Sequence, residues 1–146
     1  MGGGGLEKVI EKRLREMREA LVKAERFARC AAERLAPAAA ILYGSFSRGD
    51  FNEWSDLDVL IVTGKRLPPN PLRRLDAIED CLRATPEAEP LILTLDELEK
   101  SIERCNPAAT EALTQGTLLA DTGVSQTRLE KAKRLAERCK QYNRRA

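Results

Sequence analysis

A regular row of apolar residues from Leu6 to Leu35, here called the stripe, strongly restricts the structure that the first part of this chain can adopt. Apolar or small residues recur there in steps of three and four, which is the spacing of one face of an α-helix. They are Leu6, Ile10, Leu14, Met17, Leu21, Ala24, Ala28, Ala31 and Leu35. Pro37 follows, so the pattern predicts one helix that ends near Leu35. A helix of about 30 residues is ~45 Å long, which exceeds the core of a small domain, so we expect part of the stripe to contact another chain.

Beyond Pro37 the apolar pattern changes from the helical period to short continuous runs, which predict buried strands. We expect strands over 38–43, 55–63, 89–95 and 117–121, and helices over 72–83, 94–105, 108–115 and 124–142. Thr94, with Glu97 three residues later, is a typical start signal for the second of these helices. The order predicts an α/β (α+β) domain in which a long N-terminal helix and a C-terminal helix flank a small mixed sheet.

Length and composition favour a single globular domain and exclude several classes of function. The 146 residues suit one domain, expected over 6–146 after a flexible glycine tail at 1–5. A hydrophobic share of 42% is ordinary for such a domain, and no apolar run reaches the ~20 residues of a membrane span. The net charge of +2 gives no reason to expect bulk nucleic-acid binding. The absence of histidine excludes a histidine base.

Four widely spaced cysteines bear on the compartment in which the chain folds. They are Cys30, Cys81, Cys105 and Cys139, and apolar or helical sequence flanks each of them. Because they form no C-x-x-C pair, we expect free buried thiols in a reducing compartment, with intracellular disulfides as the lesser alternative. No apolar segment typical of a signal peptide follows Met1, so the expected location is the cytoplasm.

Polar residues gather at the ends of the first two expected strands. Gly44-Ser45 closes the strand at 38–43, where a glycine lets the backbone approach a ligand and exposed N–H groups can hold phosphate. Asp56 and Asp58 open the strand at 55–63, and alternate residues of a strand share a face. Two adjacent carboxylates suit Mg²⁺ or Mn²⁺. Taken alone, such a pair is more often a solvated strand end.

The segment GSFSRGDFNEWSDLD resembles the signature of the minimal nucleotidyltransferases of the DNA polymerase β-like superfamily. That signature is G-S, ten residues, then D-x-D, followed by an apolar strand, which is Val59 to Val62 here. The match covers 41–121 and implies the small mixed sheet of the nucleotidyltransferase fold. It also implies a metal-dependent transfer of NMP, taken as AMP from ATP, to a hydroxyl acceptor.

The resemblance assigns roles to individual residues. Gly44, Ser45 and Arg48 would bind the nucleoside triphosphate, and Asp56, Asp58 and Glu89 would hold the metal and carry catalysis. Glu89 is the expected third acid, although Asp is more usual there and the neighbouring Pro90 departs from the family pattern. Without the resemblance, Glu89 is as readily an exposed acid at a strand start. Arg48 would then more often pair with Asp50 or Glu53.

The resemblance extends to partners. Many short members of the superfamily resemble the antitoxin of a pair with a HEPN-type helical toxin, and some adenylylate a toxin tyrosine. The expected partners are therefore a nucleoside triphosphate and such a protein, or a second copy of this chain, with no membrane. The alternative is a non-catalytic binding module that neutralises a partner with the same fold. A third reading is an aminoglycoside-type adenylyltransferase, although the long C-terminal region usual for that type is not seen in this sequence.

Overall fold

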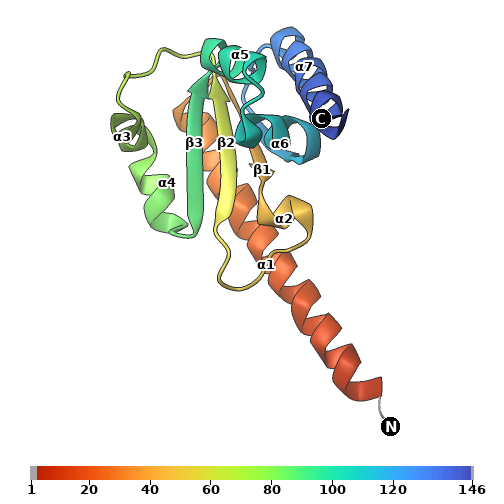
Figure 1. Cartoon of the computed structure of the whole chain (residues 1–146). Helices are drawn as coiled ribbons and strands as arrows, with labels where there is room; N and C mark the ends of the chain where they lie inside the picture. Colours follow the sequence, from red (N-terminus) through yellow and green to blue (C-terminus); the bar gives the residue numbers. More distant parts are fainter. Residues whose placement is uncertain (1–2, 146) are drawn as a thin grey trace.

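A computed structural model describes residues 3–145 and places four strands in one sheet with helices on both faces (Figure 1). The elements are α1 (Gly3–Arg34), β1 (Ala38–Tyr43), α2 (Ser45–Arg48), β2 (Leu57–Thr63), α3 (Pro71–Arg74), the 3₁₀ turn η1 (Leu75–Ile78), α4 (Glu79–Ala84), β3 (Ala88–Thr94), α5 (Leu95–Glu103), α6 (Pro107–Gln115), β4 (Thr117–Asp121) and α7 (Gln126–Arg145). The strand order is β3-β2-β1-β4. β1 runs antiparallel to β2 and β4, whereas β2 runs parallel to β3, so the predicted mixed sheet is confirmed.

Each face of the sheet carries its own hydrophobic cluster, because successive side chains of a strand point to opposite sides. On one face α1 supplies Phe27 to a cluster that includes Leu42 of β1. On the other face α6 and α7 supply Leu113 and Leu129 to a cluster that includes Leu60 of β2. The sheet is therefore held from both sides, which fixes where its strands end.

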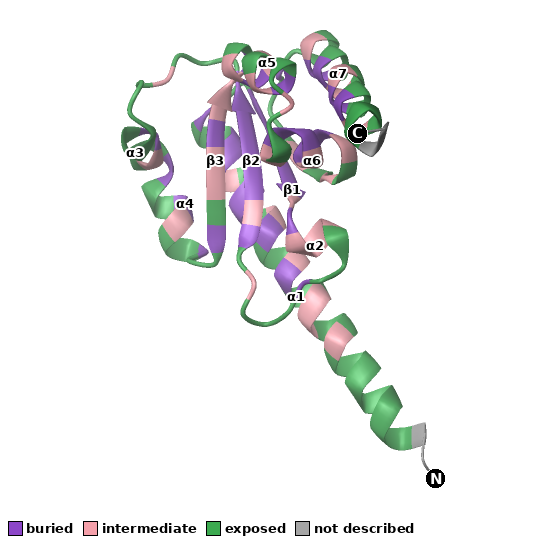
Figure 2. Ribbon diagram, in the orientation of Figure 1, coloured by how far each residue is buried: buried purple, intermediate pink, exposed green. Residues whose placement is uncertain are grey.

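Only the later part of α1 packs on the sheet, and its N-terminal part projects beyond the domain (Figures 1 and 2). Ala24 is fully buried, whereas Leu6, Val9, Ile10 and Leu14 are 66%, 64%, 49% and 51% exposed. The predicted stripe is thus one continuous helix, of which this domain's core uses one part.

Some element boundaries differ from the expectation. α1 begins at Gly3, so Gly3 to Gly5 of the expected tail are helical, while Met1 and Gly2 lie outside the described residues. Because a helix is held by backbone hydrogen bonds between residues four positions apart, glycines can continue it although they have no side chain. The single helix expected over 72–83 is divided into α3, η1 and α4, since 3₁₀ turns often connect short helices. Within residues 3–145, no helix is long and apolar enough to cross a membrane.

The expectation of free thiols is wrong, because the four cysteines form two disulfides. Cys30 of α1 is bonded to Cys81 of α4, and Cys105, after α5, is bonded to Cys139 of α7. The bonded residues are 51 and 34 positions apart in sequence, yet their Cα atoms lie 5.7 and 5.5 Å apart. Helix packing produces this proximity, and spacing along the chain does not reveal it. The cysteines therefore give no support to a reducing compartment.

Candidate active site

A cross-strand row at one end of the sheet brings together three of its polar side chains. Tyr43 of β1 is paired with Asp58 of β2, and Asp58 is paired with Glu89 of β3. Alternation along each strand puts Asp58 on the side of Leu60 and Glu89 on the side of Leu91, which is the face covered by α6 and α7. The parallel register of β2 and β3 therefore places the predicted third acid directly beside the D-x-D pair.

The electrostatics of the carboxylates show that they face one another. Burial raises the pKa of Asp58, and the negative charge of Asp56 raises it further. Glu89 is exposed at the start of β3, where partial desolvation raises the pKa of its carboxyl group, with additional increases from the carboxylates of Asp58 and Asp56. Asp56 itself is exposed, just before β2. The three acids thus form one group of negative charge, in which the ionisation of Asp58 and Glu89 is disfavoured, and a cation would relieve that cost.

Gly44 provides the space into which Asp58 fits. Its φ of +76° is in the region that residues with a side chain rarely adopt. A Cβ on Gly44 would lie 2.0 Å from Oδ2 of Asp58, which is far inside van der Waals contact. The glycine of the G-S pair is therefore required by both backbone conformation and the carboxylate that packs against it.

Ser45 and Arg48 lie at the two ends of α2, which follows this glycine. Ser45 is half-buried, and the neighbouring Ser47 donates from Oγ to the carbonyl of Leu42 at 3.2 Å, which ties the turn to β1. Nη1 of Arg48 lies 2.7 Å from Oε1 of Glu111, and its Nε lies 3.4 Å from Oδ2 of Asp50. Asp50 was one of the two partners considered from the sequence. Glu111 was not, since 63 residues separate it from Arg48.

Tyr43 is a second residue that sequence reasoning missed. Burial, followed by the charges of Asp58, Glu89 and Glu111, raises the pKa of Tyr43 to about 12. Its hydroxyl is therefore protonated at neutral pH, so it can donate a hydrogen bond but cannot act as a base. The available signal was its position, directly before Gly44 at the end of a strand.

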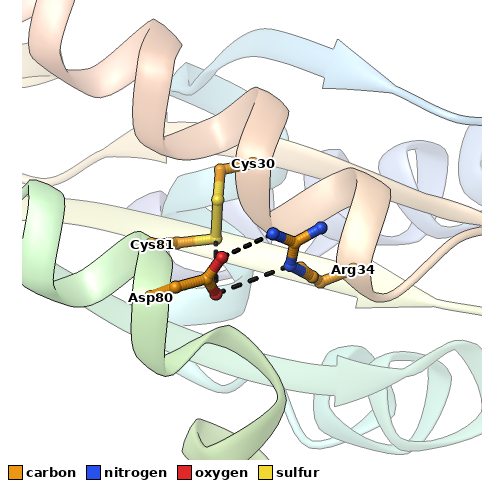
Figure 3. Close-up of a disulfide and its surroundings, with 4 residues drawn as sticks. All are labelled: Cys30, Arg34, Asp80 and Cys81. Atoms are coloured by element: carbon orange, nitrogen blue, oxygen red, sulfur yellow. Dashed lines mark hydrogen bonds and ion pairs between the residues drawn. A yellow bond between two sulfur atoms is a disulfide. The ribbon is translucent and has the colours of Figure 1, made fainter.

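The donor chemistry of the three acids fits a hard divalent cation, because carboxylate oxygens are the ligands that Mg²⁺ and Mn²⁺ prefer. Within residues 3–145, Cys30, Asp80 and Cys81 form the only three-residue group whose possible ligand atoms all lie within 4.8 Å of one another. That group is no metal centre, since its sulfurs are bonded to each other and the Asp80 carboxylate pairs with Arg34 (Figure 3). Sharing one ion among Asp56, Asp58 and Glu89 would require their side chains to draw closer.

Comparison with solved structures identifies the fold. A toxin-antitoxin structure with AMP-PNP aligns with a TM-score of 0.51 and 18% identity over 77% of this chain and 82% of that chain. A protein from Sulfolobus solfataricus, described as a nucleotidyltransferase, aligns with a TM-score of 0.48 and 19% identity over 73% and 87%. A mutant of the toxin-antitoxin pair MntA-HpeT gives 0.49 and 17% over 77% and 82%. No match was found among curated proteins.

The fold and the row of acids at its sheet end define the class, a nucleotidyltransferase domain. The model of the nucleotidyltransferase domain family matches residues 24–115, which is more than half of the chain. The protein belongs to this family, and the resemblance found in its G-S and D-x-D residues is confirmed.

Proposed function

We propose that the protein transfers a nucleoside monophosphate, AMP from ATP, to a hydroxyl group of a partner protein in a reaction that depends on Mg²⁺ or Mn²⁺. The observation that carries this proposal is the register that sets Asp58 beside Glu89. The carboxylate of Asp56 is close enough to raise the pKa of Glu89, and Gly44 packs against the side chain of Asp58. A divalent cation bound by these three carboxylates would neutralise charge on the phosphates. Gly44, Ser45 and Arg48 would hold the β- and γ-phosphates.

The chain's own residues account for the remaining steps. The acceptor oxygen forms a bond to the α-phosphorus, and the bond from that phosphorus to the bridging oxygen of the leaving pyrophosphate breaks. The acceptor proton passes to the carboxylate of Glu89, which acts as the base. The guanidinium of Arg48 binds the β- and γ-phosphates, which leave together as pyrophosphate.

A partner protein is proposed as the acceptor for two reasons. The N-terminal part of α1 exposes Leu6, Val9, Ile10 and Leu14, an apolar surface of the kind that contacts other proteins. The structure with a TM-score of 0.51 is a toxin-antitoxin structure with AMP-PNP. The family resemblance makes a helical HEPN-type toxin the first partner to test, and we propose to seek it as the product of a neighbouring gene.

The experiment combines the purified protein, Mg²⁺ or Mn²⁺, ATP labelled at the α-phosphate, and the protein of the neighbouring gene. The expected result is label on the partner, with mass added in AMP units, and its loss in the double variant Asp56→Asn/Asp58→Asn. The other nucleoside triphosphates, tested in parallel, establish base preference. Absence of label with every nucleotide and both metals, from a folded protein, would overturn the proposal.

The same exposed surface of α1 favours a second candidate, a non-catalytic module that neutralises a partner by binding alone. In that case the double variant would still neutralise the partner. Loss of neutralisation together with loss of label would favour the enzyme.

A further inference from the structure

The side chain of Arg48 is held by a residue that no motif assigns. Its Nη1 lies 2.7 Å from Oε1 of Glu111, while its bond to Asp50 is 3.4 Å long. The side chain of Glu111 is 23% exposed and that of Asp50 is 62% exposed. Glu111 is therefore the closer and better-shielded of the two acids.

Glu111 stands on a firmly anchored helix, whereas Arg48 ends a helix of only four residues. α6 buries Ala109, Ala112 and Leu113 against the sheet. Its N-terminus is capped by Asn106, whose Oδ1 accepts a hydrogen bond from the backbone of Ala109 at 3.1 Å. The backbone of Glu111 is thus fixed by the packing and capping of α6. The carboxylate of Glu111 can therefore set the direction of the Arg48 side chain on α2, the shorter helix.

The position of this ion pair relates it to the row of acids. Glu111 and Arg48 both lie close enough to Asp58 for their charges to act on it in opposite directions, and Glu111 acts on Tyr43 as well. The ion pair therefore borders the group of carboxylates.

We propose that Glu111 is a positioning residue, whose carboxylate holds the guanidinium of Arg48 at the place where it meets the phosphates of a nucleoside triphosphate. The inference rests on the proposed function. A long flexible side chain that is already oriented loses less freedom when it binds, so the ligand binds more tightly. Removal of a group that orients a metal ligand typically costs 10- to 100-fold in affinity or activity, and we expect an effect of about the same order for a group that orients a phosphate-binding arginine.

The test measures KM and kcat for ATP, and the Kd of Mg²⁺–AMP-PNP by calorimetry, in three variants. Glu111→Ala is expected to raise KM and Kd about tenfold while kcat changes about twofold at most. Glu111→Gln, which keeps an acceptor oxygen without the charge, should fall between Glu111→Ala and the wild type. Asp50→Asn is the matched control, because it removes the longer and more exposed partner of the same arginine, and it should change KM less than about twofold.

Two further measurements separate positioning from a general structural effect. Binding of AMP, which lacks the β- and γ-phosphates, should be equal in the wild type and Glu111→Ala. In an Arg48→Gln background, Glu111→Ala should have no additional effect on Kd, because the residue it positions is absent.

The possible failures point to different conclusions. An unchanged KM in Glu111→Ala, or an equal loss in the Arg48→Gln background, would overturn this inference and leave the proposed function standing. If Glu111→Ala does not fold, Glu111→Gln and the Asp50→Asn control decide the question in the same way. A wild type that binds no Mg²⁺–AMP-PNP would overturn the proposed function and this inference together.

Discussion

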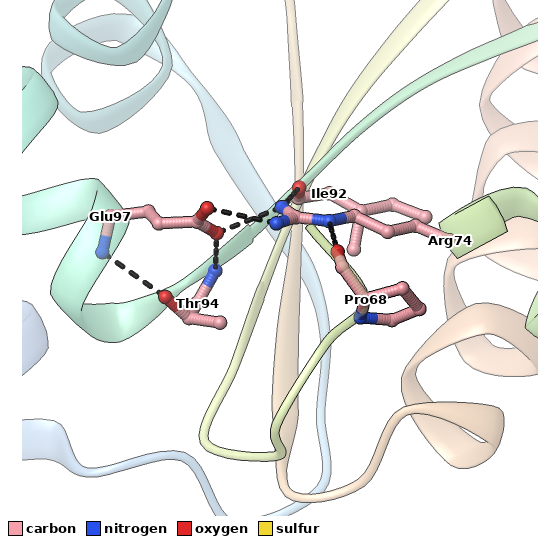
Figure 4. A network of polar contacts seen from close by, with 5 residues as sticks. All are labelled: Pro68, Arg74, Ile92, Thr94 and Glu97. Atoms are coloured by element: carbon pink, nitrogen blue, oxygen red, sulfur yellow. Dashed lines mark hydrogen bonds and ion pairs between the residues drawn. The ribbon is translucent and has the colours of Figure 1, made fainter. Parts of the chain in front are cut away.

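One glutamate at the start of β3 and another just beyond its end, in the first turn of α5, have opposite electrostatic surroundings. At the start of the strand, Glu89 faces Asp58 and Asp56, and partial desolvation together with these charges raises its pKa. Just after the end of the strand, Glu97 is bonded to Arg74, and this arginine with the backbone of Thr94 lowers the pKa of Glu97 to about 2 (Figure 4). One glutamate lies in a group of like charges, and the other is fully paired.

The paired end serves the fold. Arg74 is 7% exposed, and its Nη1 and Nη2 lie 2.8 and 2.9 Å from the two carboxylate oxygens of Glu97. The same guanidinium donates to the carbonyls of Pro68 and Ile92 at 2.8 and 2.9 Å. It therefore joins the loop before α3, the edge strand β3 and the start of α5. This chain thus pairs the acid that serves its structure with an arginine, and groups together the acids that we assign to a cation.

Loss of Glu89 tests the first end of β3 and is expected to have the largest effect. Glu89→Gln should lower kcat by about 100- to 10,000-fold, the range seen when a group that takes a proton is removed, without loss of folding. Glu87→Gln is the control, since Glu87 lies two residues earlier and pairs with Lys23 instead. The rate of AMP transfer is measured for both variants. If Glu89→Gln is as active as Glu87→Gln, Glu89 is not part of the active site.

Loss of Arg74 tests the structural role of the ion pair with Glu97, just after the end of β3. Arg74→Ala leaves the Glu97 carboxylate and two carbonyl groups without their partner, so the free energy of unfolding should fall by about 3 kcal/mol. The exposed neighbour Arg73 supplies the control, and Arg73→Ala should change stability by about 0.5 kcal/mol or less. Urea denaturation measures both, and a similar small change in the two variants would contradict the structural role.

The pKa shifts of Glu97 and Glu89 have opposite signs, so the two carboxyl groups should affect the pH dependence of stability in opposite ways. The pKa of Glu97 is lowered from 4.5 to about 2, so its contribution to stability is present above pH 4.5 and is lost as the pH falls toward 2. Because the side chain is 39% exposed, solvent screening reduces this contribution, and we expect about 2 kcal/mol. Glu97→Gln should flatten the pH dependence of unfolding over this range. A parallel curve for the variant would show that another group is responsible.

Removal of one like charge should have the smallest effect, and it should stabilise. The pKa of Asp58 is raised, so its ionisation opposes folding as the pH rises through the range above its ordinary value. Asp58→Asn should therefore raise stability by about 1 kcal/mol at pH 7, as is common at functional sites. The gain should shrink as the pH is lowered, because protonation removes the charge of the wild-type carboxylate. Thermal denaturation at both pH values measures it, and a loss of stability at pH 7 would contradict the account.

Local sequence patterns predicted most of the helices and strands and proposed residues for the site. The steps of three and four in the stripe reflect the helical repeat, and Thr94 with Glu97 forms the capping box at the start of α5 that the sequence indicated. Gly44 and Asp58 are predicted as site residues because the G-S and D-x-D spacing resembles the family signature, and both motifs lie in one short segment of the chain.

The contacts that join distant segments could be read only from the tertiary structure. The register that sets Asp58 beside Glu89, the pair of Arg48 with Glu111 and the two disulfides all depend on how helices and strands pack. Glu97 makes one contact of each kind. Its hydrogen bond with Thr94 joins residues three positions apart, and its bond with Arg74 joins residues 23 positions apart. A pattern along the chain records interactions within a few residues. Those that close longer loops are set by the packing of the whole core.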